Sequence, residues 1–117
     1  MQLNEVTFSG ATPIDGYGPG FFRVGGTVIQ GPVCLTLEAA IDWLGFDDES
    51  IIEKLQGRVD VLLVGTGPEM RPIPTAMRQA FDDAGIGVEP MSSPSACRTY
   101  NVLLSEGRRI AVALMPV

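Results

Sequence analysis

The fold of this chain is decided by the stretch Val59-Asp60-Val61-Leu62-Leu63-Val64-Gly65-Thr66-Gly67. A nearly unbroken apolar run of this length is typical of a strand that is buried on both faces, because a strand with one solvent-exposed face alternates apolar and polar residues. The two glycines that follow predict a tight loop at its carboxyl end. We therefore expect a buried strand at 59–64, with the rest of the chain packed around it.

The length of 117 residues predicts a single domain over positions 1–117, since it is ordinary for one domain and short for two. Apolar residues make up 45% of the chain and charged residues 19%, as in globular proteins. The 8 basic and 14 acidic residues argue against nucleic-acid or anionic-membrane partners. With no apolar stretch of roughly 18 residues and no basic signal-peptide start, we expect no transmembrane segment and a cytoplasmic protein.

Groups that could support catalysis or metal binding are few. The chain has no histidine, which removes Ser-His and Cys-His nucleophile pairs and the commonest base at neutral pH. Cys34 and Cys97 are predicted to be buried thiols, because one pair without a secretion signal does not indicate a disulfide framework. The acidic residues at 47–49 and 82–83 lack the pattern of a calcium loop or a catalytic dyad. We expect no enzymatic activity, no cofactor and no metal.

The first part of the chain predicts mainly antiparallel β-structure. Residues 2–8 are predicted as a short strand, and Gly25 with Gly26 separates two β-favouring runs, as in a hairpin with a primed turn. A further strand is predicted at 33–36.

Two segments of this part are less regular. Residues 15–20 contain three glycines and a proline, a composition that predicts a surface turn. The pattern of residues Leu37 to Leu44 fits a helix and a strand alike, and spacing by itself does not decide between them.

Two helices flank the central strand in the predicted order of elements. Asp47 and Asp48 offer N-caps to a short helix that precedes the strand. Apolar side chains at helical spacing, including Met77 and Phe81, predict a second helix that ends at Gly85.

The last third of the chain completes a strand–helix–strand–helix–strand order. A short strand is predicted at 86–89, ended by Pro90. Ser93 is predicted to cap a helix that carries Cys97 on its apolar face, and residues 110–115 form a second continuous apolar run.

The glycine turn invites a nucleotide-binding hypothesis, since such turns bring backbone N–H groups toward anions. The spacing argues against it, because Met70 stands where a dinucleotide motif needs a third glycine, and no lysine followed by serine or threonine is present. Asn101 is an unusual residue in the middle of a helix: its amide suits a bond to the glycine loop, a ligand contact or exposure to water. We expect exposure.

Several segments of the second half together resemble a known family. They are Leu62 to Gly67, Gly85 to Met91, Ala96, Thr99 to Asn101, Leu103 and Glu106 to Arg108. Their order and spacing are similar to a small α/β domain family of unknown function, which includes mitochondrial NADH dehydrogenase (complex I) assembly factor 3 and an adipogenesis-associated animal protein. The first half fits more loosely, through residues 14–18 and the Gly31 and Trp43 regions.

The resemblance implies an α/β fold: a mixed β-sheet with helices packed on it, plus additional N-terminal antiparallel β-structure. It also implies that residues 39–44 are strand-like. The family has no established catalytic residues, and its assembly factor implies a protein partner, such as a subunit of a respiratory or other membrane complex.

Two functions follow as hypotheses. The first is a non-enzymatic binding or assembly protein, and the alternative is a small-molecule or anion-binding protein, or an enzyme without a recognisable motif, with its ligand at the glycine loop. The predicted interaction surface consists of Gly65, Thr66, Gly67, Met91, Arg98 and Asn101.

Overall fold

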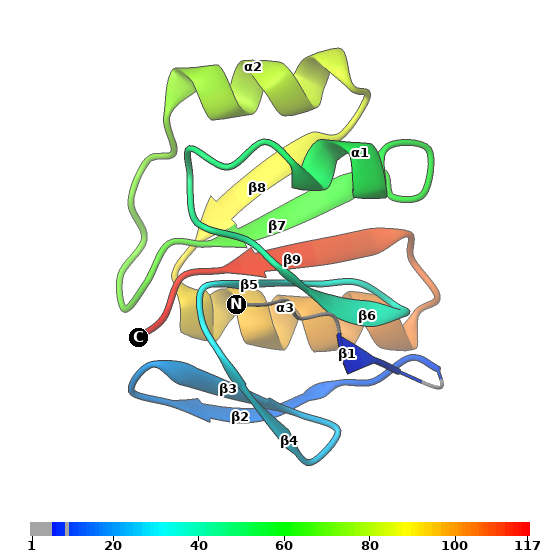
Figure 1. Ribbon diagram of the computed structural model, residues 1–117, viewed down its shortest axis with the longest axis vertical. Helices are drawn as coiled ribbons and strands as arrows, with labels where there is room; N and C mark the ends of the chain where they lie inside the picture. Colours follow the sequence, from blue (N-terminus) through cyan, green and yellow to red (C-terminus); the bar gives the residue numbers. More distant parts are fainter. Residues whose placement is uncertain (1–5, 9) are drawn as a thin grey trace.

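The computed structural model describes residues 6–8 and 10–117, whose strands form two sheets (Figure 1). The larger sheet has the order β1-β6-β5-β9-β7-β8 and the smaller one the order β2-β3-β4. The strands of the larger sheet are β1 (Val6–Thr7), β5 (Val33–Leu35), β6 (Ala39–Asp42), β7 (Val61–Gly65), β8 (Gly87–Met91) and β9 (Ile110–Leu114). The smaller sheet contains β2 (Ile14–Gly18), β3 (Phe21–Val24) and β4 (Thr27–Gln30). The helices are α1 (Ile51–Leu55), α2 (Thr75–Asp83) and α3 (Ser93–Ser105).

The larger sheet is mixed, as predicted. β7 lies between β8 and β9 and runs parallel to both, with Leu63 opposite Val112 of β9. β5 is antiparallel to β9 and to β6, and β1 is antiparallel to β6. The predicted strand–helix–strand–helix–strand order is confirmed as β7-α2-β8-α3-β9.

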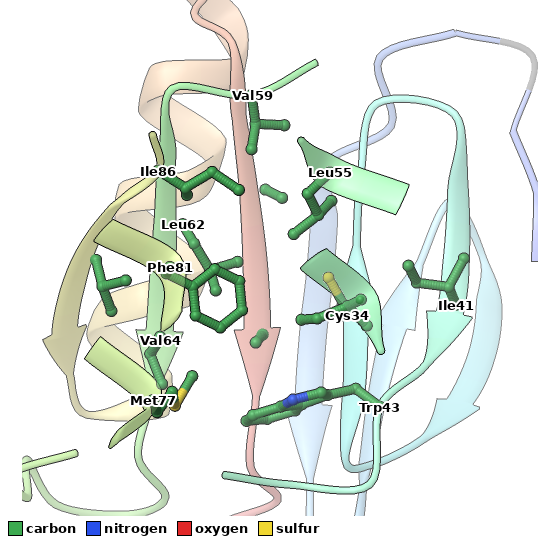
Figure 2. Packing of buried hydrophobic residues seen from close by; sticks show 14 of the residues in the cluster. Cys34, Ile41, Trp43, Leu55, Val59, Leu62, Val64, Met77, Phe81 and Ile86 are labelled. Carbon is green, nitrogen blue, oxygen red and sulfur yellow. The ribbon is translucent and has the colours of Figure 1, made fainter. Parts of the chain in front are cut away.

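Both faces of this sheet are covered, which explains the continuous apolar runs of β7 and β9. Along β9 the side chains alternate between two core clusters, so Ala111 and Ala113 face one side and Val112 and Leu114 the other. The first cluster includes residues of α1 and α2, among them Leu55 and the centrally placed Phe81 (Figure 2). The second cluster joins α3 and the smaller sheet to the other face of the larger sheet. The larger sheet is therefore the middle layer of the molecule.

The smaller sheet corrects one prediction. Most of segment 15–20 is not a surface turn but belongs to β2, which pairs antiparallel with β3 and has an irregular register between Ile14 and Gly16. Gly18 leaves space for the ring of Phe21, because a Cβ there would come to 2.5 Å from Cε2 of that ring. The predicted hairpin is confirmed, and Gly25 and Gly26 take φ values of +58° and +81° between β3 and β4.

The region before α1 corrects a predicted cap. The N-cap position of α1 is Ser50, and Asp48 instead accepts hydrogen bonds from the backbone N–H groups of Leu44 and Ser50, both at 2.9 Å. Burial acts to raise the pKa of Asp48, but these bonds and one from the Ser50 hydroxyl outweigh it and lower the pKa. Asp48 therefore organises the loop that leads into the helix.

Two local predictions around β8 were wrong. Pro90 does not end this strand but lies within it, opposite Val64. A proline is tolerated here because β8 is an edge strand, where a missing backbone N–H need not break the pairing of the sheet. The side chain that caps α3 is Ser92, whose hydroxyl accepts from Ser95 N–H at 3.3 Å. Ser93 lies inside the helix and is fully buried.

The ambiguous segment 37–44 contains strand β6, so the strand implied by the family resemblance is confirmed. The predicted first strand at 2–8 is observed as β1 for Val6–Thr7, and residues 2–5 lie outside the described residues.

Candidate functional site

The glycine turn after β7 is a buried junction. Gly65, Thr66 and Gly67 are all buried. The N–H of Thr66 donates to the carbonyl of Met91 at 2.8 Å, and the N–H of Gly67 donates to Oγ of Ser93 at 3.0 Å. Both donors that an anion would need are therefore bound within the protein. We call Gly65, Thr66, Gly67 and Ser93 the glycine junction.

The Ser93 hydroxyl connects the junction to the end of β9. It donates to the carbonyl of Met115 at 2.6 Å while it accepts from Gly67, and the N–H of Met115 donates to Gly65 at 2.9 Å. Sequence reasoning assigned Ser93 to a helix cap and missed this role. The signal that was available is the presence of two serines, Ser92 and Ser93, before Pro94, of which one suffices as a cap.

Gly65 has no space for a side chain. A Cβ at this position would lie 2.7 Å from Oγ of Ser93 and 2.8 Å from Cδ2 of Leu114. This glycine therefore serves the close approach of β7 to α3 and β9, and not the approach of a ligand.

Asn101 was predicted to be exposed, and this prediction is wrong. Its side chain is half-buried and forms two hydrogen bonds with the backbone of Ile14. Oδ1 accepts from Ile14 N–H at 2.8 Å, and Nδ2 donates to the Ile14 carbonyl at 2.9 Å. Asn101 thus pairs with β2 as a neighbouring strand would, and it attaches the smaller sheet to α3.

Met91 and Arg98 are the two members of the predicted surface that remain accessible. Met91 is half-buried, and Arg98 is exposed with Nη2 donating to Oγ of Ser95 at 3.2 Å. The predicted set therefore divides into three buried residues of the junction, one residue that joins α3 to the smaller sheet, and these two. A role for Met91 and Arg98 in partner binding stays a prediction.

Exposed apolar side chains lie at the same end of the sheet. β6, β7, β8 and β9 run in the same direction, so the loops that follow β6 and β7 lie at the same end of the larger sheet as Met91, the last residue of β8. Leu44 follows β6 and is 84% exposed, and Met70 follows β7 and is 58% exposed. We call Leu44, Met70 and Met91 the carboxyl-end surface.

Hydrogen bonds hold one of these loops in place. The Thr66 side chain donates to the carbonyl of Glu69 at 2.7 Å and accepts from Arg71 N–H at 2.9 Å, which folds the segment containing Met70 back onto the end of β7. Sequence reasoning noted Met70 only as the place of a missing glycine. The exposure of Leu44 was not predicted, because the sequence pattern did not decide between helix and strand for residues 37–44.

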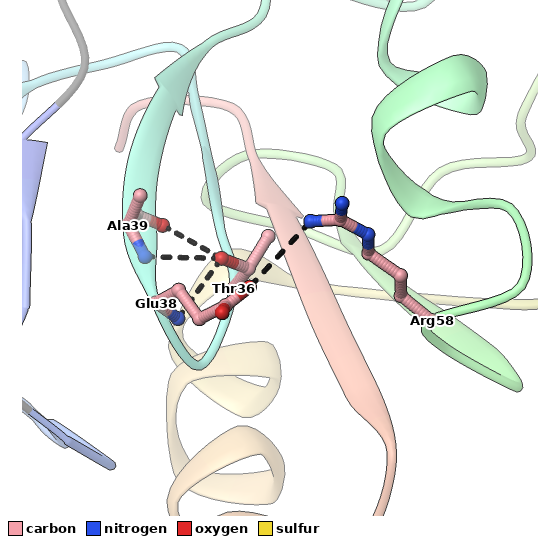
Figure 3. Close-up of polar contacts among 4 residues, drawn as sticks. All are labelled: Thr36, Glu38, Ala39 and Arg58. Atoms are coloured by element: carbon pink, nitrogen blue, oxygen red, sulfur yellow. Dashed lines mark hydrogen bonds and ion pairs between the residues drawn. The ribbon is translucent and has the colours of Figure 1, made fainter.

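The opposite end of the sheet carries an open cleft of about 510 Å³. It lies between the turn of residues 36–39 and α1 with the loop after it, and we call it the α1 cleft. Figure 3 shows the polar contacts at this site: the Thr36 hydroxyl oxygen bonds within its own turn, and Nη1 of Arg58 lies 3.6 Å from Oε1 of Glu38. No local sequence pattern indicates this cleft, because its two walls are separate segments of the chain.

The thiols show no sign of activation. Cys34 and Cys97 are both free and buried, as predicted. Burial raises the pKa of Cys34 to about 12 and that of Cys97 to about 11, so both stay protonated at neutral pH.

Within the described residues, no three His, Cys, Asp or Glu side chains are grouped as metal ligands. Among those same residues, no helix has the length and apolar character that crossing a membrane requires.

The family model described as "Protein of unknown function (DUF498/DUF598)" matches residues 14–115. The chain belongs to this family. The match includes both sheets of the fold apart from β1, and it confirms the resemblance seen in the sequence.

Named relatives of this DUF498/DUF598 member include an uncharacterized protein of Rhodobacter capsulatus, which is 49% identical over 117 residues, covering 100% of this chain and 94% of that protein. NADH dehydrogenase (ubiquinone) 1 alpha subcomplex assembly factor 3 of Homo sapiens is 32% identical over 123 residues. That alignment covers 99% of this chain and 67% of the human protein. The DUF498/DUF598 domain is thus shared with a longer assembly factor.

A solved structure confirms the fold of this family member. The crystal structure of a Bartonella henselae protein, described as an outer membrane protein, has a TM-score of 0.82 and 34% sequence identity. The match covers 94% of this chain and 98% of that one. The predicted architecture, a mixed sheet with packed helices and an N-terminal antiparallel sheet, is confirmed.

Proposed function

We propose that this chain is a non-enzymatic protein that assists the assembly of a respiratory or other membrane complex by binding one of its subunits. The observation that carries the proposal is the 32% identity to a named assembly factor across 99% of the chain. A shared fold hosts many functions, so the function depends on the residues of a contact site.

The carboxyl-end surface is the proposed contact site. Leu44 and Met70 are large apolar side chains that water surrounds for most of their area, and such side chains gathered at one end often mark an interaction site. Met91 and the exposed Arg98 extend this site toward α3. Gly65, Thr66 and Gly67, which were predicted to be part of the interaction surface itself, are buried beneath this site and support its loops.

Anion binding at the glycine junction finds no support in the geometry. The N–H groups of Thr66 and Gly67 already donate to Met91 and Ser93, and no donor of this pair remains for a ligand.

The test is a deletion of the gene in the organism that encodes this chain, followed by native gel electrophoresis of its membrane complexes. We expect a lower level of at least one assembled respiratory complex, restored by the unaltered chain. Complementation with Leu44→Glu and Met70→Glu together should fail, whereas Val102→Glu, which alters an exposed side chain on α3, should restore assembly. Normal levels of every complex in the deletion strain would reject the proposal.

We also propose a cytoplasmic location, in line with the acidic composition of the chain. Fractionation of cells that carry a tagged copy tests it, and recovery of the protein in an outer-membrane fraction would contradict it.

A further inference from the structure

We propose that the α1 cleft is a binding site for a small amphipathic carboxylate, a ligand with an apolar body and one carboxylate group. This inference concerns a different site from the carboxyl-end surface and goes beyond the proposed assembly function.

The floor of the cleft accounts for the apolar body. Five buried apolar side chains line it: Ala39, Ile41, Leu55, Val59 and Ile110. Ligand sites in proteins typically combine such an apolar lining with a few polar groups at the opening, and the volume of about 510 Å³ lies in their usual range. Leu37, which is 39% exposed, extends the apolar wall to the surface.

The rim accounts for the carboxylate. Arg58 and Lys54 both line the cleft, and they are two of only 8 basic residues in an acidic chain. Arg58 contacts Glu38 through one N–O pair at 3.6 Å, and the two side chains are 72% and 79% exposed. Such exposed ion pairs are weak, so a ligand carboxylate that binds the guanidinium through two hydrogen bonds can replace Glu38.

The charge of the rim limits the ligand to a single negative charge. Glu38 and Glu53 also line the cleft, so its charged side chains balance at two positive and two negative. Displacement of Glu38 leaves both carboxylates nearby, which disfavours a polyanion such as a nucleotide. The Thr36 hydroxyl cannot hold a head group in the present turn, because it donates to the Ala39 carbonyl and accepts from the N–H groups of Glu38 and Ala39 (Figure 3).

The experiment titrates the purified chain with octanoate and follows backbone amide shifts by NMR and heat by calorimetry. Octan-1-ol provides the body without the charge, and acetate the charge without the body. We expect saturable binding of octanoate at one site, with shifts at residues 36–39 and 53–59, and binding of acetate at least tenfold weaker. Shifts centred elsewhere, or no saturation, would overturn the proposal.

Matched arginine variants test the role of the rim. Arg58→Gln should weaken octanoate binding at least tenfold and leave octan-1-ol binding within twofold. Arg71→Gln is the control, because Arg71 also forms one exposed ion pair, at 3.9 Å to Glu69 with 68% and 80% exposure, but follows β7 at the other end of the sheet. Equal octanoate affinity in the Arg58→Gln and Arg71→Gln variants would refute the assigned head-group site.

A third variant tests the wall. Leu37→Gln should weaken octanoate and octan-1-ol to a similar degree, since Leu37 contacts the body and not the head group. If octan-1-ol binding is unchanged, the assignment of the apolar body to this cleft is wrong. Because these measurements use no partner protein, they succeed or fail independently of the assembly test.

Discussion

At the carboxyl end of β7, one buried and one partly buried hydrogen bond of Ser93 close the glycine junction, whereas at the amino end of the same strand one exposed ion pair lies across the rim of the α1 cleft. The glycine turn, which suggested a ligand, is the place where the N–H groups of Thr66 and Gly67 already donate to groups of the protein. Gly65 allows two strands and a helix to approach one another, and Gly67 takes a φ of +110°, while the cleft contains no glycine among its lining residues. Glycines after a buried strand thus indicate close backbone approach, and ligand binding requires further evidence.

Gly65→Ala should cause the largest loss of stability in this comparison. The added methyl group would lie within 3 Å of Ser93 and Leu114, on rigid elements that cannot easily move apart. We expect the free energy of unfolding to fall by about 3 kcal/mol, at the upper end for overpacked sites. Urea denaturation measures this change.

The control for that variant is Gly87→Ala on the neighbouring strand β8. A Cβ at Gly87 meets Asp60 and Val61 at 3.7 and 3.9 Å, which are ordinary contacts. Its stability should change by about 0.5 kcal/mol or less, as at sites without a special packing role. If the two variants were equally stable, the junction would be less tightly packed than the distances indicate.

Ser93→Ala should have the next largest effect. It removes the hydroxyl that bonds the buried N–H of Gly67 and the partly buried carbonyl of Met115, so both backbone groups lose this partner. We expect a loss of about 2 kcal/mol in the free energy of unfolding, the usual cost of unsatisfied buried groups. Amide hydrogen exchange at Gly67 should accelerate in the same variant.

Ser105→Ala is the matched control for this substitution. Its hydroxyl is exposed and donates to the Val102 carbonyl within the same helix. A change beyond about 0.5 kcal/mol there would mean that serine-to-alanine exchange in α3 acts through helix propensity and not through the junction.

The fold was predictable where burial leaves a local pattern. β7 and β9 are covered on both faces, so they read as continuous apolar runs, and α2 has Met77 and Phe81 at helical spacing. β2 was missed because Gly18 serves packing against Phe21, which composition cannot distinguish from turn chemistry.

The site was less predictable because its contacts are distant in sequence. Asn101 bonds Ile14 across 87 positions, and no local pattern identifies such a partner. The α1 cleft likewise needs the 36–39 turn, the loop after α1 and Ile110 to meet. Of the predicted interaction residues, Met91 and Arg98 retain the accessibility on which that prediction depended.

Asn101→Ala should lower stability by a smaller amount than the junction variants. Both hydrogen bonds to Ile14 are lost, but the site is half-buried and water can replace part of the interaction. We expect about 1–2 kcal/mol, the range for partly compensated polar groups. Relative to the unaltered chain, a larger acceleration of hydrogen exchange in β2 than in β7 would locate the loss in the smaller sheet. An equal acceleration in both strands would contradict the assigned role.

Glu38→Gln should change stability least, and this prediction separates the two ends of the sheet most directly. The Glu38 carboxylate makes one 3.6 Å contact to Arg58 with both side chains largely in water, so its removal should cost about 0.5 kcal/mol or less. Glu69→Gln at the similarly exposed pair with Arg71 should behave alike, and 1 M salt should remove any difference between the two. If Glu38→Gln instead destabilised the chain as much as Ser93→Ala, the ion pair would be part of the folded framework. Arg58 would then not be free to exchange Glu38 for a ligand, and the contrast between a closed junction and an open cleft would fail.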